Sequence, residues 1–427
     1  MEIEAIYSKF LEANNLTTDT RKLSEGSMYV ALKGENFDGN RFVKDAFEKG
    51  AKYCIVDDPN ACINSNCMLV KNSLETLQAL ARHHRHQFQF PIIGLTGSNG
   101  KTTTKELIYA VLSTTYKVKA TKGNLNNHIG VPLTLLEFPL DLDFGIVEMG
   151  ANHQKEIEFL SHISQPDYGL ITNFGKAHLE GFGGVEGVIK GKSELYDFVR
   201  SNNKTAFING DDPKQIKQIG TYSNTVVFGS NEENDCVIEF IDAKPFVKIR
   251  YNNTEINSQL IGTYNFGNIA VATAIGHHFK ISTDNIKAGI ENYVPENNRS
   301  QIIKKGSLEI ILDAYNANPS SMLGALTNFR QIESDTKYLF LGDMFELGDE
   351  AIVEHQNIID FAEQNFSKNI FLIGENFYRS KTKPTTQKFK TFQDLIPQLK
   401  SHHIENATLL IKGSRGMALE RILEFIN

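Results

Sequence analysis

The chain has 427 residues, which at roughly 100–200 residues per domain suggests two to four domains. Hydrophobic residues make up 41% and charged residues 22%, an ordinary composition for a soluble globular protein. The net charge of −7 argues against a broad basic surface for nucleic acid, and no segment reaches the roughly 18 apolar residues that a membrane-spanning helix needs.

The start of the chain and its cysteines point to the cytoplasm. Residues 1–5 lack the basic and apolar regions of a signal peptide. The cysteines form no CxxC pair and no zinc-finger spacing, so we expect reduced thiols; they are Cys54, Cys62, Cys67 and Cys236. We therefore expect a cytoplasmic protein with no membrane insertion.

The first block, residues 1–88, is predicted to be a small α/β unit. Tyr53–Val56 has the continuous apolar character of a buried strand and is followed by Asp57-Asp58-Pro59. Ser73 is expected to cap a helix whose apolar stripe begins at Leu74.

The second block, residues 89–297, alternates short apolar strands with helical stretches. The predicted strands cover 92–95, 144–147, 169–171 and 206–208. This alternation is typical of βαβ units, so we expect a mostly parallel sheet. Near the end of the block, 237–240 and 247–250 indicate antiparallel ribbons, with Asn252-Asn253 as a turn.

The third block, residues 298–427, repeats the alternating pattern. Its predicted strands cover 310–312, 338–341, 370–373 and 409–411, with helices between them. This pattern predicts a second doubly wound α/β unit.

A phosphate loop is predicted where the strand at 92–95 meets the next helix. Gly97-Ser98-Asn99-Gly100-Lys101-Thr102 places glycines, a lysine and a hydroxyl between a strand and a helix N-terminus. Glycines let backbone N–H groups turn toward phosphate oxygens, and the helix dipole favours the negative charge. The motif is imperfect because position 95 is Leu. A glycine-rich turn with a surface lysine is the structural alternative.

Three polar side chains are candidates for metal or acid chemistry. Glu148 ends a predicted strand, where parallel sheets bind ligands, so it is a candidate Mg²⁺ ligand beside Thr102. His178 follows another strand end and is expected at the same edge, although an isolated histidine is more often a surface or core residue. By composition alone, Lys192 would be a solvated helix lysine.

Together these segments resemble the Mur ligase family along nearly the whole chain. The matching segments are, in order, GSNGKTTTKE (97–106), VEMGA (147–151), TNFGKAHLEGFGG (172–184), GKSEL (191–195), YNFGN (264–268), DAYNANPSSM (313–322), LGDMFELG (341–348) and KGSRGM (412–417). The resemblance implies three domains: a smaller α/β UDP-substrate-binding domain (1–88), a central ATP-binding domain with a P-loop ATPase-like parallel sheet (89–297), and a C-terminal Rossmann-like domain that binds the amine substrate (298–427).

The resemblance also implies ATP and two Mg²⁺ ions. It assigns one ion to Thr102 and Glu148 and a second to His178. Lys192 matches the lysine that is carbamylated in this family and so becomes an anionic metal ligand. Lys101, Glu148, His178 and Lys192 form the implied catalytic set. The implied ATP-binding residues are Gly97, Ser98, Asn99, Gly100, Lys101, Thr102, Thr103, Asn265, Asn268, Arg299 and Asp313.

Within the family, 313–322 and 341–348 resemble the members that add D-alanyl-D-alanine to UDP-N-acetylmuramoyl-tripeptide in peptidoglycan precursor synthesis. The D-N-P-type motif of the third-residue-adding relatives is missing, because Ala317 precedes Asn318-Pro319. His128 stands where the family often has glutamate. The resemblance implies Thr20 and Arg21 for the uridine nucleotide, and Asn126, Asn127 and His128 for the muramoyl-peptide. Asp343 follows a predicted strand end, where open α/β sheets bind ligands, so we expect the amine to contact Asn316, Asn318, Asp343 and Arg415. The structural alternative is that Asn316 and Asn318 only shape the turn before Pro319 and cap the next helix.

The implied reaction is ATP-dependent amide formation through an acyl phosphate, catalysed by a monomer. Domain closure would bring Arg299 and Asp313 onto the nucleotide and exclude water. Two alternatives stay open. One is another ligase of this fold, either third-residue-adding or of the folylpolyglutamate type. The other is a phosphate-loop NTPase switch, which would hydrolyse ATP or GTP without making an amide.

Overall fold

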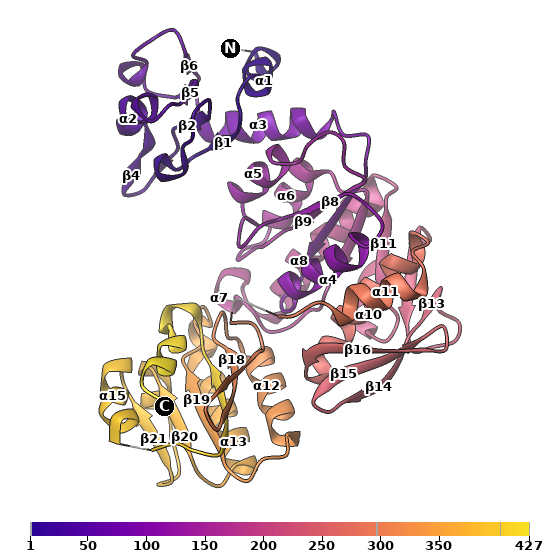
Figure 1. The fold of residues 1–427 in the computed structure, drawn as a ribbon, viewed down its shortest axis with the longest axis vertical. Coiled ribbons are helices and arrows are strands. Elements are labelled where there is room, and N and C mark those ends of the chain that lie inside the picture. The colour runs from indigo at the N-terminus through magenta and orange to yellow at the C-terminus, as the bar shows by residue number, and fades with distance from the viewer. Residues whose placement is uncertain (1, 296–297, 402, 427) are drawn as a thin grey trace.

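The computed structural model describes residues 2–295, 298–401 and 403–426. Three successive portions of the chain each contain a main sheet with helices packed around it (Figure 1). This arrangement confirms the predicted α/β class. Within the described ranges, no helix is both long and apolar enough to cross a bilayer.

The first portion contains a parallel sheet in the order β1-β2-β5-β6. Its elements are α1 (Ile3–Leu11), β1 (Leu16–Thr17), β2 (Met28–Val30), the hairpin β3 (Lys33–Gly34) and β4 (Phe37–Asp38), α2 (Val43–Glu48), β5 (Tyr53–Val56), β6 (Cys67–Leu69) and α3 (Ser73–Arg85). β5 matches the prediction. The cap of α3 is Asn72 rather than Ser73: the Asn72 side chain accepts the N–H groups of Leu74 and Glu75, and Ser73 is already helical.

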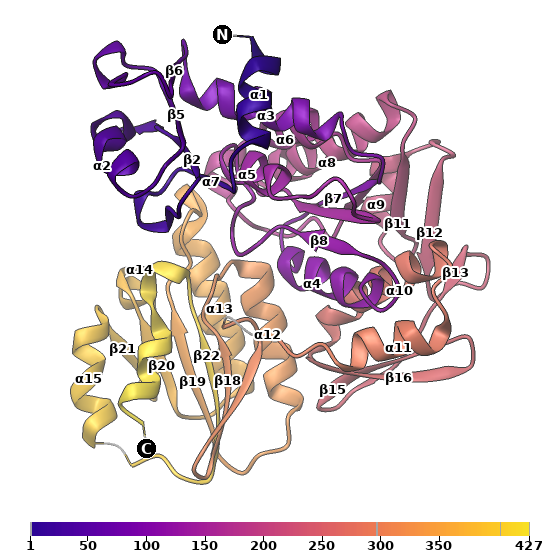
Figure 2. The same cartoon turned by 45° about the horizontal axis from the view of Figure 1, so that its top comes forward.

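Helix α3 joins the first portion to the second. It packs against α5 (Gly130–Leu136) and α6 (Glu156–Ser164), as Figure 2 shows. The buried Arg85 side chain donates to the Ser164 carbonyl oxygen at 2.9 Å and to the Asp167 carboxylate at 2.7 Å. His84 Nε2 donates to the Phe138 carbonyl oxygen at 2.9 Å. The C-terminal half of α3 is therefore embedded in the second portion.

The second portion is built on a seven-stranded sheet in the order β13-β12-β11-β10-β7-β9-β8, in which every pair is parallel. The strands are β7 (Ile92–Thr96), β8 (Val118–Ala120), β9 (Phe144–Glu148), β10 (Tyr168–Ile171), β11 (Thr205–Asn209), β12 (Thr225–Gly229) and β13 (Cys236–Val237). The remaining helices are α4 (Lys101–Leu112), α7 (Leu179–Phe182), α8 (Val185–Ser201), α9 (Pro213–Ile219), α10 (Phe266–His278) and α11 (Thr283–Glu291). All four predicted strands are confirmed as β7, β9, β10 and β11.

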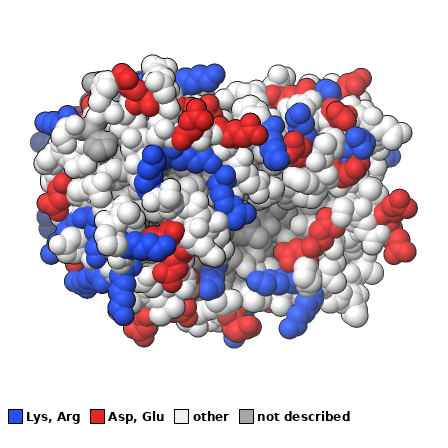
Figure 3. Space-filling model, turned by 90° about the horizontal axis from the view of Figure 1, so that it is seen from below, with Lys and Arg blue, Asp and Glu red and all other residues white. Residues whose placement is uncertain are grey.

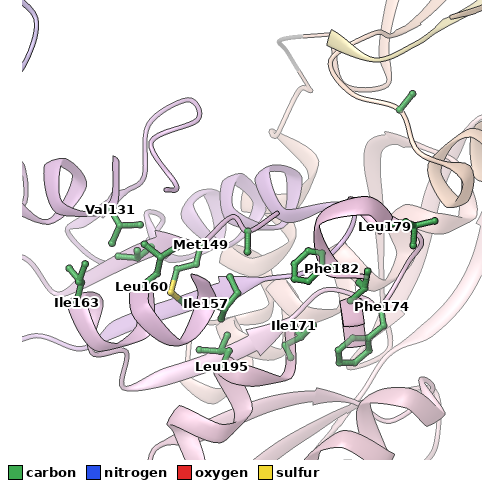
Figure 4. Close-up of a cluster of buried hydrophobic side chains, with 14 of the residues drawn as sticks. Val131, Met149, Ile157, Leu160, Ile163, Ile171, Phe174, Leu179, Phe182 and Leu195 are labelled. Atoms are coloured by element: carbon green, nitrogen blue, oxygen red, sulfur yellow. The ribbon is translucent and has the colours of Figure 1, made fainter. Parts of the chain in front are cut away.

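A buried apolar cluster fixes the strand ends that face the site. Figure 4 shows Met149, just after β9, beside Leu160 of α6, with Ile171 of β10 and Leu195 of α8 nearby. Each of these side chains is almost fully buried. Burial of one such side chain stabilises the fold by about 1.5–3 kcal/mol, so the cluster holds the C-terminal ends of β9 and β10 in place.

An antiparallel sheet follows the parallel one, as predicted. It consists of β14 (Glu239–Ala243), β15 (Phe246–Tyr251) and β16 (Thr254–Ile261). The turn between β15 and β16 has Asn252 and Asn253 at φ values of 47° and 59°, which asparagine tolerates. Val237 belongs instead to β13, at the edge of the parallel sheet, so the observed ribbon begins at Glu239, two residues later than predicted.

The third portion has a six-stranded sheet in the order β17-β18-β22-β19-β20-β21. The elements are β17 (Gln301–Lys305), β18 (Leu308–Asp313), α12 (Pro319–Gln331), β19 (Lys337–Gly342), α13 (Ala351–Asn365), β20 (Ile370–Ile373), α14 (Glu375–Arg379), β21 (Thr386–Phe389), α15 (Phe392–Ser401) and β22 (Ala407–Lys412). The predicted strands are confirmed as the adjacent β18, β22, β19 and β20. The sheet also has two edge strands that were not predicted, antiparallel β17 and parallel β21.

Candidate active site

A cleft of about 1350 Å³ lies where the three portions meet. The first portion contributes α3, the second contributes the C-terminal edge of its sheet, and the third contributes the segment after β18 and the start of α12. On the face of the molecule seen in Figure 3, Lys and Arg side chains are interspersed with Asp and Glu. The cleft lies at the C-terminal ends of parallel strands, where α/β sheets bind ligands.

The predicted phosphate loop lines this cleft between β7 and α4. Gly97 has φ 146°, and a Cβ there would lie 1.9 Å from Thr172 Oγ1. Gly100 has φ 77°, and a Cβ there would lie 2.6 Å from Asn268 Oδ1. Both positive φ values and both close contacts require glycine, so these two residues shape the turn between β7 and α4.

Lys101 is the first residue of α4, and its ammonium group folds back over the loop. Its Nζ donates to the Gly97 carbonyl oxygen at 2.7 Å. Burial lowers the pKa of Lys101, while nearby Glu148 raises it and Arg299 lowers it further. An incoming polyanion would offset that burial cost, so the lysine is suited to hold phosphate oxygens.

Thr102 and Glu148 lie side by side, as their sequence positions predicted. The Thr102 hydroxyl donates to Glu148 Oε2 at 3.0 Å, and Asn126 Nδ2 donates to Glu148 Oε1 at 2.8 Å. Glu148 is 1% exposed at the end of β9. A hydroxyl and a carboxylate converging beside a phosphate loop are oxygen ligands that suit Mg²⁺.

Lys192 is not the solvated lysine that composition alone suggests. It is 0% exposed in the middle of α8, its Nζ donates to the Ala151 carbonyl oxygen at 3.0 Å, and it lies 4.8 Å from the centre of the Phe182 ring. Burial sets the pKa of Lys192 well below its usual range, and the positive charge of Lys101 lowers it further. The cost of burying a charge therefore disfavours the ammonium form of Lys192.

His178 lines the cleft just before α7, and its Nδ1 bonds to the Glu346 carboxylate of the third portion. Glu346 in turn has a pKa below its usual value, chiefly because of this bond. Among the described residues, no three His, Cys, Asp or Glu side chains gather closely enough to hold a metal. Any metal here would take most of its ligands from water, bound phosphate or a modified side chain.

The residues expected at the nucleotide also line the cleft. Asn268 Nδ2 donates to Asn265 Oδ1 at 2.8 Å, which fixes both amides at the start of α10. The Arg299 guanidinium lies 3.7 Å from the centre of the Tyr315 ring. Asp313, at the end of β18, accepts a bond of 2.5 Å from Lys412 Nζ. The second and third portions thus face each other across the expected nucleotide position.

Two groups of expected substrate residues also reach the cleft. Asn126, Asn127 and His128 line its wall near α3, where Gln78 Nε2 donates to the His128 carbonyl oxygen at 3.0 Å. Asn316 and Asn318 line the opposite wall. Asn318 caps α12, and its Nδ2 donates to Asn99 Oδ1 of the phosphate loop at 2.7 Å. The capping role that sequence reasoning left open for Asn318 coexists with a position in the site.

Four expected substrate residues do not line the cleft in this arrangement. Thr20 and Arg21 lie in the first portion, where Arg21 is paired with Asp19 and its side chain is 86% exposed. Arg415 is paired with Glu420 at 2.8 Å. Asp343 is 3% exposed, and its carboxylate accepts the N–H groups of Asn376 and Phe377 at the start of α14. Strand-end position alone placed Asp343 near the amine, but the turn after β19 directs its side chain into the fold.

The cleft contains residues that sequence reasoning missed. Tyr264, Tyr315 and Lys412 line the nucleotide side, and Gln154, Lys155 and Phe159 line the side toward α3. Lys412 and Tyr315 stand within quoted motifs, and Lys412 ends β22 beside Asp313. Glu148 was selected as a polar side chain at the C-terminal end of a parallel strand, and the same reasoning applies to Lys412.

Replacing Asp343 with asparagine should lower the free energy of unfolding by about 1 kcal/mol, because an amide oxygen can replace only part of the helix cap. Urea denaturation would measure this loss. The apparent KM for D-alanyl-D-alanine should stay within twofold of that of the unmodified protein. A tenfold rise confined to this KM would instead place Asp343 in contact with the amine.

Comparisons with known proteins identify the family. Three family models match: "Mur ligase family, catalytic domain" over 12–86, "Mur ligase middle domain" over 95–276 and "Mur ligase, glutamate ligase domain" over 298–415. The chain is 34% identical to a Bacillus subtilis protein named UDP-N-acetylmuramoyl-tripeptide--D-alanyl-D-alanine ligase, covering 96% of this chain and 92% of the relative.

Solved structures agree. The crystal structure of MurF from Acinetobacter baumannii has a TM-score of 0.86 at 28% identity, covering 99% of this chain and 97% of that one. The structure of MurF ligase from Thermotoga maritima in complex with ADP has a TM-score of 0.84 at 26% identity, covering 97% of both chains. With its fold, phosphate loop and these matches taken together, the chain belongs to the Mur ligase family.

Proposed function

We propose that this protein joins D-alanyl-D-alanine to UDP-N-acetylmuramoyl-tripeptide, using ATP, to form the UDP-N-acetylmuramoyl-pentapeptide of peptidoglycan synthesis. The observation that carries the proposal is the shared cleft, in which a phosphate loop faces polar walls from the other two portions. Two relatives that match nearly the whole chain are named for this reaction, which supports the choice of substrates.

We assign residues 1–88 to the UDP-substrate, 89–297 to ATP and 298–427 to the amine. Thr20 and Arg21 are proposed to contact the uridine nucleotide, outside the cleft. Asn126, Asn127 and His128 are proposed to hold the muramoyl-peptide beside the phosphate loop, since they line the wall next to α3. Asn316 and Asn318 are proposed to hold the dipeptide. Asp343 and Arg415 would reach it only after a further rearrangement.

ATP is proposed to bind with its phosphates on residues 97–103 and its base near Asn265 and Asn268. The amides support this because their mutual hydrogen bond fixes donors and acceptors at the cleft wall. Arg299 and Asp313 approach from the third portion. The Thermotoga maritima relative was solved in complex with ADP, which supports an adenine nucleotide as a ligand of this chain.

Mg²⁺ fits beside this nucleotide. Thr102 and Glu148 offer a hydroxyl and a carboxylate whose oxygens already lie 3.0 Å apart, and His178 lines the same cleft. When bound, Mg²⁺ would neutralise phosphate charge and polarise the transferred phosphoryl group. Glu148 must then release the Thr102 hydroxyl, while Asn126 keeps the carboxylate oriented.

Lys192 is proposed to be carbamylated. Its neutral amine would attack CO₂, forming an N–C bond and releasing one proton, which converts a potential cation into an anion. Complete burial and the lowered pKa support this chemistry, because an ammonium group has no lone pair for the attack. The carbamate oxygens would add negative metal-ligating groups to a site that has few carboxylates.

The chemistry then has two steps. The terminal carboxylate of the tripeptide attacks the γ-phosphorus of ATP, the bond to the bridging oxygen breaks, and acyl phosphate and ADP form. The neutral amine of the dipeptide next attacks the acyl carbon, phosphate leaves, and the amine loses a proton. Lys101 and the loop N–H groups stabilise the charge on the transferred phosphoryl group. We propose that the protein acts as a monomer in the cytoplasm, where its nucleotide substrates are found.

The proposal predicts that ADP release requires both UDP-N-acetylmuramoyl-tripeptide and D-alanyl-D-alanine. A coupled assay should give turnover with the dipeptide at least 100-fold above that with single amino acids, because polar groups left unpaired by a missing residue cost several kcal/mol. Faster turnover with lysine or diaminopimelate on an acceptor that lacks the third residue would identify a third-residue-adding ligase. ATP or GTP hydrolysis without amide formation would identify an NTPase switch.

A further inference from the structure

Lys176 and Glu354 bridge the central and third portions of the chain next to the phosphate loop. Lys176 lies in the loop before α7, which Figure 1 shows at the junction with the third portion. Its Nζ is 2.5 Å from Glu354 Oε1 in the first turn of α13. The Lys176 side chain is 44% exposed, whereas that of Glu354 is 5% exposed.

The backbone around Lys176 makes the bridge part of a continuous network. The Lys176 N–H donates to Ser320 Oγ at 2.9 Å, at the start of α12. One residue earlier, the Gly175 carbonyl oxygen accepts from Ser98 Oγ of the phosphate loop at 2.8 Å. A Cβ at Gly175 would lie 2.7 Å from Asn99 Nδ2 and 3.2 Å from Ser320 Oγ. Residues 175–176 therefore lie between the phosphate loop and helices α12 and α13 of the third portion and contact all three.

The charge arrangement favours the observed contact between the central and third portions. Glu354 is a nearly buried carboxylate, and an unpaired buried carboxylate is costly. Lys176 belongs to the opposite portion of the molecule, so the carboxylate loses this partner if the portions separate. Contacts that break on separation stabilise closure, and closure excludes water from a reactive intermediate.

We propose that the Lys176–Glu354 ion pair is a closure latch. It holds the third portion against the phosphate loop from the formation of the acyl phosphate until the amine attacks it. Both are positioning residues, since neither is among the described residues that line the cleft. The proposal rests on the proposed ligase activity and adds a device that protects its intermediate. Loss of the latch should let water reach the acyl phosphate, which hydrolyses to carboxylate and phosphate.

The test measures ADP formed per amide formed, in the full-length protein with all three substrates. The unmodified protein should give a ratio near one. Lys176→Met should raise the ratio about fivefold, the size expected for one partly exposed ion pair, with KM for UDP-N-acetylmuramoyl-tripeptide unchanged. Lys176→Arg should restore the ratio, and Glu354→Gln in the Lys176→Met background should add nothing further.

The matched control is Glu375→Gln, which removes a carboxylate paired only within the third portion, with Arg379 and Lys390. Its ratio should stay near one. Because Lys176 is half exposed, Lys176→Met should fold even if Glu354→Gln does not, and a thermal melt of each variant checks this. A folded Lys176→Met protein with a ratio near one overturns the latch. Absence of amide from the unmodified protein overturns the proposed function instead.

Discussion

Lys101→Ala should lower turnover in the proposed ligation by about 10²–10³-fold, the usual result of removing one preorganised charge-stabilising group. The Lys101 ammonium lies over the phosphate loop and donates to the Gly97 carbonyl oxygen at 2.7 Å. Negative charge on the transferred phosphoryl group needs a fixed counter-charge there. Steady-state ADP release with all three substrates measures the effect.

The same substitution should leave the fold intact. Lys101 donates to the carbonyl oxygens of Gly97 and Ser98. Glu148 lies near Lys101 but keeps its hydrogen bonds from Thr102 and Asn126 when the lysine is removed. Circular dichroism and a thermal melt check this. Lys117→Ala, which removes an exposed lysine after α4, is the matched control and should retain full activity. Near-normal turnover of folded Lys101→Ala would remove the phosphate loop from the mechanism.

Lys192→Ala should also lower turnover, by about 10²-fold, and short carboxylates such as formate or acetate should restore part of it. The space vacated by the buried side chain can admit a small carboxylate, which would replace the carbamate oxygens. Labelled bicarbonate gives an independent measurement, since a carbamate carbon on the unmodified protein has its own NMR signal. That signal should be missing from Lys192→Ala.

Lys190→Ala is the control for Lys192. Lys190 lies on the same helix but is exposed, so both its activity and its labelling should match those of the unmodified protein. Failure of every carboxylate to rescue Lys192→Ala, together with no carbamate signal, would contradict the modification. The lysine would then be a buried positioning group for the Ala151 segment.

Much of this fold could be predicted from the sequence because its strands are short and strongly apolar. Ile92–Leu95, Phe144–Val147 and Tyr338–Leu341 each lie within observed strands that are buried on both faces. The edge strand β17 was missed because Gln301–Lys305 is partly exposed and polar, so its composition does not indicate a strand. It is a strand because its backbone pairs with β18.

The candidate site was predicted best where function requires unusual local chemistry. Gly97 and Gly100 are needed for backbone shape, and Thr102 follows at once in the chain, so spacing alone placed them together. Asp343 shows the limit of reasoning from strand-end position. The side-chain direction there is set by the N–H groups of Asn376 and Phe377, more than 30 residues away in the chain. Single-sequence patterns carry no signal for such pairings.

Helix α3 constrains the order in which the protein folds during synthesis. Its buried Arg85 bonds to Ser164, Gln165 and Asp167 of the second portion. His84 bonds to Phe138 there as well as to Tyr7 of α1. As the chain leaves the ribosome, the first 88 residues therefore emerge well before the surface that receives this helix. We expect the nascent N-terminal portion to stay incomplete, with the inner face of α3 open to chaperones, until about 80 further residues have been translated.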